Sequence, residues 1–485
     1  MSVADTSLAV PAEQGSAKRK ESGARELLMR LAGAAALIGS VALSLWLVLA
    51  ATARPSQLSP RAIDAHFAPW IVGPLGHLMS GLHATPVELR SDRFHVLVGL
   101  FVCWLVAAYC ARSLPLWAVG AALGLLGLIF LLSPPMALTD LFNYLHYGRM
   151  GALHGLNPYQ DLPFTARHDP SWQLTNWRHL LSPYGPLFTL VTYFLALLPY
   201  HAAYWAWKLI VMLSAFGVLA LVAWIAPHVG RSPQRAVAFV GLNPLVLVFG
   251  LGGQHNDPLM LVVVLAAVAL VIRGSQPAAD RGWSIGAGAA AVAAAGVKLS
   301  AIALAPLVIV ATPRRRSALA GAAAAAVVVA LVILIAFGGY LPNAVAQDRL
   351  VGSFSVPQIL GWIGGQGGET EFVHTLANVI FALSVIVATV VVWRRPAWFI
   401  GTCGSVMLVA VLTLGWTMPW YVWWVLPFAA LARTRWLAGF CVLLTIWLAI
   451  GAIPEGARVT SAVGYKPWTT PAGKAHVIYT RSLLR

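Results

Sequence analysis

The sequence has few charged residues, and this shortage sets the class of protein. Of its 485 residues, 10% are charged, against roughly 25% in a soluble domain. Hydrophobic residues make up 59%, and apolar runs of about 18 residues or more recur along the chain from residues 27–50 onward. These runs lack the period-two alternation of membrane-barrel strands. We therefore predict an all-α integral membrane protein, a polytopic bundle of about 12–14 transmembrane helices.

Cysteine is scarce as well. The four cysteines, Cys103, Cys110, Cys403 and Cys441, all lie within apolar segments, which argues against a disulfide framework or a cysteine metal site and predicts buried thiols. Residues 1–24 are polar and contain no apolar core, so they do not resemble a cleavable signal peptide. We interpret them as a disordered cytoplasmic tail.

Acidic residues number only 16 against 32 Lys and Arg, which gives a net charge of +16. Many basic residues lie in short connections between apolar runs, at positions 18–20, 273, 314–316, 394–395, 433 and 435. This is the positive-inside bias of membrane proteins, which sets orientation and meets anionic headgroups. It argues against nucleic acid as a partner and favours membrane lipids.

The apolar pattern divides the chain into a transmembrane domain, residues 25–453, and a polar carboxy-terminal tail, residues 454–485. Helices are predicted at 27–52, 94–112, 114–133, 186–200, 203–226, 235–251, 258–273, 283–297, 299–312, 317–337, 372–393, 397–415, 420–432 and 434–453. The long connections 53–93, 134–185 and 338–371 are predicted to be external. Membrane crossings counted forward from a cytoplasmic amino terminus and back from the basic connection 314–316 disagree by one, between residues 185 and 226. A re-entrant or tilted 186–200 resolves this disagreement, since that segment extends only about 22 Å of the roughly 30 Å apolar core.

One connection contains the polar sequence DLFNYLHYGRMGALHGLNPY at residues 140–159. In a helix, Asp140 and Tyr144 share one face, and Phe142 and Arg149 lie on the other. We predict an amphipathic helix in the membrane interface, capped by Thr139, with Arg149 reaching a headgroup phosphate. A simple interfacial anchor is the alternative, but it does not explain an acid at this depth, which favours a functional Asp140.

Three further polar or aromatic sites follow along the chain. The run Gln254, His255, Asn256 and Asp257 lies between two apolar helices and predicts a polar cavity, although an aspartate before a proline is also a common helix cap. A lysine between two apolar runs, Lys298, predicts a bound anion such as phosphate, the alternative being a snorkelling lysine. The aromatic run 416–424 contains Trp420 and Tyr421 and suits either a membrane girdle or the wall of a sugar or prenyl site.

Together these motifs resemble a known family. Asp140, Tyr144 and the run Gly155-Leu-Asn-Pro-Tyr159 resemble the C-type, multi-spanning glycosyltransferases. The segments 241–244 and 253–260 resemble, more narrowly, the actinobacterial polyprenol-phosphomannose-dependent α-1,6-mannosyltransferases. The resemblance covers roughly residues 90–430. It implies transfer of mannose from polyprenyl-phosphate mannose to a lipid-linked mannan or glycan acceptor, with inversion and an α-1,6 linkage, on the extracytoplasmic face of the plasma membrane.

The resemblance also implies roles for residues. Asp140 would be the general base, and Lys298 or Arg149 would stabilise the departing phosphate. The expected substrate-binding residues are Tyr144, Arg149, Asn157, Tyr159, Gln254, His255, Asn256, Asp257, Lys298, Trp420 and Tyr421. A monophosphate donor has less need of a metal than a nucleotide sugar, so no metal or other cofactor is expected. An arabinose or glucose donor remains an alternative, as does a lipid flippase, although no internal repeat supports a transporter.

Overall fold

The structure is a computed structural model that describes residues 12–52, 68–78, 86–136 and 140–484. All of the regular elements in these ranges are helices, as the sequence predicts. Thr139 and most of the predicted external connection 53–93 lie outside the described residues. The protein is thus an all-α, polytopic membrane protein.

The helices of the first half are α1 (Ala12–Thr52), α2 (Pro69–Val72), α3 (Pro86–Cys110), α4 (Leu116–Leu132), α5 (Asp140–His154), α6 (Pro186–Ala196), α7 (Tyr200–His228), α8 (Pro233–Gly241), the π-helical turn η5 (Val246–Leu251) and α9 (Asp257–Gly274). Short 3-10 turns in the first half are η1 (Pro74–His77), η2 (Ala111–Ser113), η3 (Pro163–Ala166) and η4 (Pro170–Leu174).

The second half comprises α10 (Arg281–Val297), η6 (Leu299–Leu304), α11 (Ala305–Ala311), α12 (Arg315–Phe337), α13 (Ala344–Asp348), α14 (Val356–Ile363), α15 (Glu371–Arg394), η7 (Pro396–Trp398), α16 (Phe399–Thr413), η8 (Pro419–Trp424), α17 (Leu426–Leu431), α18 (Trp436–Ala452), α19 (Pro454–Ala462), η9 (Pro467–Thr469) and α20 (Pro471–Leu484). Each predicted helix has a counterpart, but three of them, at 235–251, 299–312 and 420–432, are each divided into two shorter pieces. The first helix begins at Ala12, well before residue 27.

Fewer single helices can cross a membrane than the predicted 12–14. Among the described residues, seven are long and apolar enough, and an eighth results if the bent pair Trp436–Ala452 and Glu455–Ala462 is one span. The prediction counted each apolar run as one straight helix, and several runs are short or interrupted. Proline and other breaks divide these runs. Such breaks are tolerated in a membrane domain because neighbouring helices satisfy the freed backbone groups.

The divided helices nevertheless connect the same two ends of the bundle. The pair α8 and η5 begins beside Arg231 and leads to the polar run 252–257. The pair η8 and α17 leads back, from Trp420 to Ala432, whose carbonyl accepts a hydrogen bond from Arg231. Broken helices of this kind place backbone and polar side chains inside a membrane domain only where protein or a cavity surrounds them.

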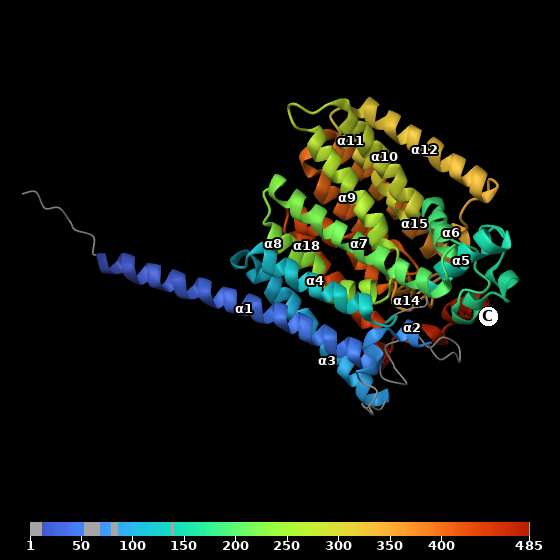
Figure 1. Cartoon of the computed structure of the whole chain (residues 1–485), viewed down its shortest axis with the longest axis horizontal. Coiled ribbons are helices and arrows are strands. Elements are labelled where there is room, and N and C mark those ends of the chain that lie inside the picture. Colours follow the sequence, from blue (N-terminus) through green and yellow to red (C-terminus); the bar gives the residue numbers. More distant parts are fainter. Residues whose placement is uncertain (1–11, 53–67, 79–85, 137–139, 485) are drawn as a thin grey trace, which may run out of the picture.

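Two short helices, α5 and α6, lie side by side at one end of the molecule, together with α14 and the carboxy terminus (Figure 1). At eleven residues, α6 extends only about 16 Å. It is not among the helices long enough to cross a membrane.

The carboxy-terminal tail is helical and covers this end. Its Tyr479 hydroxyl donates to the carbonyl of Ala346 at 3.0 Å, and the carbonyl of Leu483 accepts from the backbone N–H of His179 at 3.0 Å. The tail therefore packs on both long connections, 134–185 and 338–371. By contrast, α12 and α15 bury little of their apolar surface in the bundle, as lipid-facing helices do.

Candidate active site

The helix α5 is buried, and the predicted interfacial helix with one lipid-facing side is wrong. Its first nine residues and Met150 are buried on every side. The apolar face does not meet lipid, because the Phe142 ring stacks on Tyr204 of α7 with centroids 6.0 Å apart. The sequence of α5 has the helical spacing of polar and apolar residues that predicts two different faces, but both faces are covered by other parts of the same chain.

The polar face of α5 holds the connection that follows it. The side-chain oxygen of Asn143 accepts hydrogen bonds from the backbone N–H groups of Asn176 and Trp177, both at 3.2 Å. The Tyr147 hydroxyl donates to the carbonyl of Leu180 at 2.6 Å. These contacts fix residues 176–180 against α5, and they place the Trp177 indole N–H 3.3 Å from Oδ1 of Asp140.

Asp140 itself retains a little solvent contact. Its side chain is 12% exposed, and Oδ2 lies 3.4 Å from Nδ1 of His255. The first residue of a helix is a favourable place for a carboxylate, because the helix dipole is positive there. Asp140 thus has one oxygen directed by Trp177 and a second oxygen that faces an imidazole.

The polar run 252–257 is buried, as the sequence predicts. Gln254, His255, Asn256 and Asp257 have no exposed surface. Gln254 has a positive φ of 56°, and a side chain at Gly253 would collide with the carbonyl oxygen of Phe249, so the run makes a tight turn that needs glycine. The ring of His255 stacks on Trp420 with centroids 3.4 Å apart.

Several polar atoms in this turn have no hydrogen-bond partner within the described protein, although Nδ1 of His255 has Oδ2 of Asp140 3.4 Å away. They are both ring nitrogens of His255, both side-chain amide atoms of Asn256, Oε1 of Gln254 and Oδ2 of Asp257. A buried polar group without a hydrogen bond costs about 1–3 kcal/mol. So many together indicate a place where a polar ligand or water supplies the missing hydrogen bonds.

Lys298 has an anion, but the anion is a side chain. Its Nζ lies 2.7 Å from Oδ1 of Asp257, which also accepts a hydrogen bond from the Trp424 indole N–H at 2.5 Å. Asp257 begins α9, yet its side chain makes no capping hydrogen bond there. The Lys298 ammonium lies over the rings of Tyr421 and Trp424, at 4.9 and 5.1 Å. Aromatic faces and a carboxylate together surround the ammonium group at this depth.

Asp140 and Lys298 meet at one cavity. It is lined by Asp140, Tyr144, Trp177, Leu180, Pro183, Tyr184, Lys298, Gln347, Leu350, Trp416, Met418, Trp420 and Tyr421. The lining therefore combines the connections 134–185 and 338–371 with the aromatic run 416–424. Burial, followed by the negative charge of Asp140, raises the pKa of the Tyr144 hydroxyl well above its ordinary value, so this phenol remains a proton donor.

A second and larger cavity adjoins the first. Its volume is about 580 Å³, and it shares Trp416, Met418 and Trp420 with the smaller cavity. Phe249, Phe354, Trp447 and Leu448 make its wall mostly apolar, and Arg481 lies at its edge. The polar cavity and a lipid-sized apolar cavity therefore stand on either side of Trp420.

Comparisons with known proteins show what the chain is similar to. Residues 92–314 match the family model described as the amino-terminal domain of α-(1→6)-mannopyranosyltransferases. The chain is similar to α-(1→6)-mannopyranosyltransferase A of Mycobacterium tuberculosis, with 29% identity over 369 residues and 68% of each chain covered. It also resembles a probable α-(1→6)-mannopyranosyltransferase of Mycolicibacterium smegmatis, with 25% identity over 391 residues and 68% of each chain covered. No solved structure matches.

The chain is similar to this family over residues 92–314 and is a membrane glycosyltransferase, as its motifs suggested. The match with α-(1→6)-mannopyranosyltransferase A of Corynebacterium glutamicum is shorter, at 29% identity over 147 residues and 29% of each chain. The mannopyranosyltransferase family model spans Asp140, the run 252–257 and Lys298, but it ends before the aromatic run 416–424.

Seven residues expected to bind substrate do not line this cavity. Four of them form the buried run Gln254, His255, Asn256 and Asp257, which adjoins the cavity through the stacking of His255 on Trp420 and the pairing of Asp257 with Lys298. The other three are Arg149, Asn157 and Tyr159. Arg149 pairs with Asp169 at 2.8 Å instead of meeting a phosphate. Asn157 donates to the carbonyl of Phe337 at 2.7 Å, and its Oδ1 accepts from the backbone of Tyr159 at 3.0 Å. The Tyr159 hydroxyl lies 2.9 Å from both the carbonyl of Tyr184 and Oγ1 of Thr189. Their polar groups hold the fold of the connection 155–185.

Asp169 is an anchor that the sequence did not reveal. Burial raises the pKa of this carboxyl, but hydrogen bonds from Arg149, Ser171 and His154 outweigh burial and hold its pKa below the ordinary value. Asp169 therefore stays ionised and ties its connection to α5. Its spacing from Arg149 in the sequence follows no helical or strand period, so only the folded chain shows the pair.

Trp177, Trp424 and Lys208 were also missed. Trp177 and Trp424 each direct an indole N–H to one of the two carboxylates of the site. Lys208 is fully buried in α7 and donates to the carbonyl of Ser133, the residue that follows α4. A lysine within an apolar run can be recognised from the sequence, and Lys208 lies in the run 203–226.

No group of three or more His, Cys, Asp or Glu side chains among the described residues is placed to hold a metal ion. The site presents instead two carboxylates, one lysine and several aromatic rings. This donor set suits a sugar ring, which packs on aromatic faces and bonds to carboxylates, and an anion, which pairs with the lysine.

Proposed function

We propose that this enzyme transfers a mannosyl residue from polyprenyl-phosphate mannose to a mannan-type acceptor, forming an α-1,6 linkage with inversion. The observation that carries the proposal is that Asp140 and Lys298 line the same small cavity. A carboxylate and an ammonium at one cavity supply the two groups that such a displacement needs. The family match and the printed activity of the relatives support mannose as the sugar.

Asp140 acts as the general base. As the acceptor hydroxyl attacks the anomeric carbon, its proton passes to Oδ2 of Asp140, while the Trp177 N–H keeps Oδ1 oriented. The bond from the anomeric carbon to the phosphate oxygen breaks, and the bonding pair leaves with the phosphate. One base and one displacement invert the anomeric configuration, so a β-linked donor gives an α-linked product.

Lys298 receives the charge that develops on the leaving phosphate. Its pairing with Asp257 fixes the ammonium 2.7 Å from one carboxylate oxygen and leaves the other N–H donors available. A preoriented cation of this kind stabilises a transition state without reorganising when charge appears. His255 lies behind the small cavity, stacked on Trp420 and 3.4 Å from Asp140, so it positions these two lining residues.

The apolar cavity beside Trp420 suits the prenyl chain of the donor. Its volume of about 580 Å³ and its phenylalanine, tryptophan and leucine walls favour a branched hydrocarbon. The catalytic cavity is much smaller, about 30 Å³, which is close to the volume of one water molecule in the liquid. Sugar binding therefore requires residues around the mouth, such as Gln347 and Leu350, to move.

We further propose that the site faces the extracytoplasmic side of the plasma membrane. The basic connections 314–316 and 394–395 lie away from the site, and an arginine-rich end is expected to be cytoplasmic. A lipid-linked glycan as the acceptor is consistent with a cavity that opens at the membrane surface.

Transfer of labelled mannose tests the proposal. Membranes containing the enzyme are supplied with polyprenyl-phosphate [14C]mannose and a short α-mannoside, and the product is treated with a linkage-specific mannosidase. We expect a lengthened mannoside with a new α-1,6 bond. Preferred use of the matching arabinose or glucose donor would show that the sugar is wrong, and movement of the donor across the bilayer with no new bond would indicate a flippase.

A further inference from the structure

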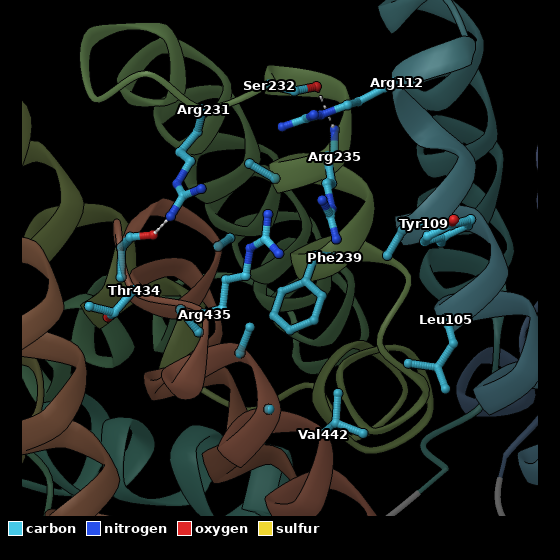
Figure 2. A pocket seen from close by; sticks show the side chains of 17 residues that line it. Leu105, Tyr109, Arg112, Arg231, Ser232, Arg235, Phe239, Thr434, Arg435 and Val442 are labelled. Carbon is cyan, nitrogen blue, oxygen red and sulfur yellow. Dashed lines mark hydrogen bonds between the residues drawn. The ribbon is translucent and has the colours of Figure 1, made fainter.

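The end of the bundle opposite the active site contains another cavity, of about 370 Å³, formed by α3, α8, α17 and α18 with the turns beside them. Four arginines line it: Arg112 in η2, Arg231 and Arg235 around the start of α8, and Arg435 at the start of α18. They come from three parts of the chain that are far apart in sequence. Their side chains converge on one space (Figure 2).

The cluster has no acidic counterpart. None of the residues that line the cavity is acidic, and none of the four arginines takes part in an ion pair within the described part of the chain. The contact that the structure gives Arg231 is a hydrogen bond to the carbonyl of Ala432. Burial, and then the positive charges of Arg235 and Arg112, lower the pKa of Arg231. Four like charges at one cavity are therefore compensated by nothing in the described protein.

The rest of the wall is apolar and reaches the outer surface of the bundle. Leu105, Tyr109, Phe239 and Val442 are among the apolar residues that line the cavity (Figure 2). Tyr109 is 61% exposed and Leu105 is 36% exposed, so this wall continues onto the surface that meets lipid. The cavity is polar and cationic at one end and apolar at the other.

We propose that this cavity binds the headgroup of an anionic phospholipid, with the phosphate between the guanidinium groups and the acyl chains along Leu105 and Tyr109. Guanidinium groups bind phosphate oxygens in pairs of parallel hydrogen bonds. A headgroup with two or more phosphates would therefore engage more of the four arginines than a headgroup with one phosphate. The positive-inside bias explains why arginines lie at this end, but it does not require four of them to line one cavity. The site is separate from the transferase cavity and does not depend on its chemistry.

Native mass spectrometry of the purified full-length protein tests the site. The protein in neutral detergent is titrated with tetraoleoyl cardiolipin, dioleoyl phosphatidylglycerol and dioleoyl phosphatidylcholine, and separately with inorganic phosphate. We expect affinity to fall in the order of the three lipids as their negative charge falls, and we expect inorganic phosphate to compete only weakly. Equal binding of the three lipids, or inorganic phosphate binding as tightly as the anionic lipids, overturns the assignment.

The variants decide whether the cavity is the place. Arg235→Gln and Arg435→Gln each remove one positive charge near the membrane surface. We expect each variant to lose about fivefold in affinity for the anionic lipids, and the double variant to lose about thirtyfold in affinity. Arg316→Gln is the matched control, because Arg316 is an exposed arginine in α12 that does not line the cavity. If the control and the double variant bind alike, the proposal is wrong. Arg112→Gln, on a different element, gives the same comparison if the double variant does not fold.

Discussion

At the scale of single residues, the site depends on how Asp140 is held. The indole N–H of Trp177 is 3.3 Å from Oδ1, and this hydrogen bond orients the carboxylate toward the cavity. Hydrogen bonds to a charged group are worth more than neutral ones, because the charge polarises the donor. Trp177 is therefore a positioning residue, whereas Asp140 is the proposed base.

Trp177→Phe removes the donor and keeps most of the packing. We expect kcat for mannosyl transfer to fall about tenfold, or ~1.4 kcal/mol in activation free energy, with little change in KM. Trp468→Phe, in the carboxy-terminal tail and 38% exposed, is the control and should not change either constant. If both variants lose the same thermal stability and have the same kcat, Trp177 has only a packing role.

The Lys298–Asp257 pair allows charge and stability to be separated. Lys298→Gln leaves a buried carboxylate unpaired, and removing one partner of such a pair costs about 3–5 kcal/mol. The double variant Lys298→Gln/Asp257→Asn should recover most of that stability, since no buried charge is left. It should not recover transfer, because the cation that meets the leaving phosphate is gone. Recovery of both properties together would remove Lys298 from the proposed mechanism.

At the scale of elements, α5 and α6 pack without space between their backbones. A side chain at Gly148 would collide with the carbonyl oxygen of Thr192 in α6. Because α5 begins at Asp140, any displacement of this helix moves the base. The same close approach through small residues joins α10 to α12, where Gly288 meets Ala318 and Gly321 meets Ile285.

Gly148→Ala should lower both stability and transfer. Overpacking a close contact costs about 1–3 kcal/mol, so we expect a lower melting temperature in detergent and a reduced kcat. Gly124→Ala in α4 is the matched control, because a side chain there would meet nothing within 4 Å. If both alanine variants behave like the unchanged protein, the α5–α6 contact does not position the site.

The elements also show what the sequence can and cannot predict. Apolar runs give the positions of the helices because burial in lipid or protein needs apolar residues throughout. The run 254–257 predicts a polar cavity because consecutive polar side chains between apolar helices need partners. The burial of α5 was not predictable, because one face of a helix can be apolar toward lipid or toward protein, and the pattern is the same.

Particular contacts lie beyond the sequence for a related reason. Asn157 and Tyr159 belong to the run 155–159 that suggested the family resemblance, yet in the fold they hold the connection 155–185 and do not line the cavity. A motif identifies residues that matter without distinguishing a structural from a binding role. The pairs Arg149–Asp169 and Asp140–Trp177 join positions whose separation follows no period, so only the folded chain brings them together.

At the scale of the whole molecule, we propose that the two ends of the bundle face opposite sides of the membrane. Cysteine labelling with a membrane-impermeant maleimide tests this, since the native Cys110, Cys403 and Cys441 are buried and Cys103 is partly buried. We expect Lys474→Cys, exposed in α20, to react in intact cells. Arg316→Cys, exposed at the start of α12, should react only after the membrane is opened. The reverse pattern would place the active site in the cytoplasm.

The central claim is that Asp140 is the base for transfer at a cavity shared by both long connections. The most direct measurement is the rate of transfer of labelled mannose by Asp140→Asn, an isosteric change that keeps the Trp177 hydrogen bond. Asp280→Asn, a helix cap at the start of α10 that lies outside the site, is the matched control. We predict at least about a 100-fold fall in kcat for Asp140→Asn at unchanged expression and melting temperature, and no such fall for the control. A rate for Asp140→Asn equal to that of the control would contradict the account.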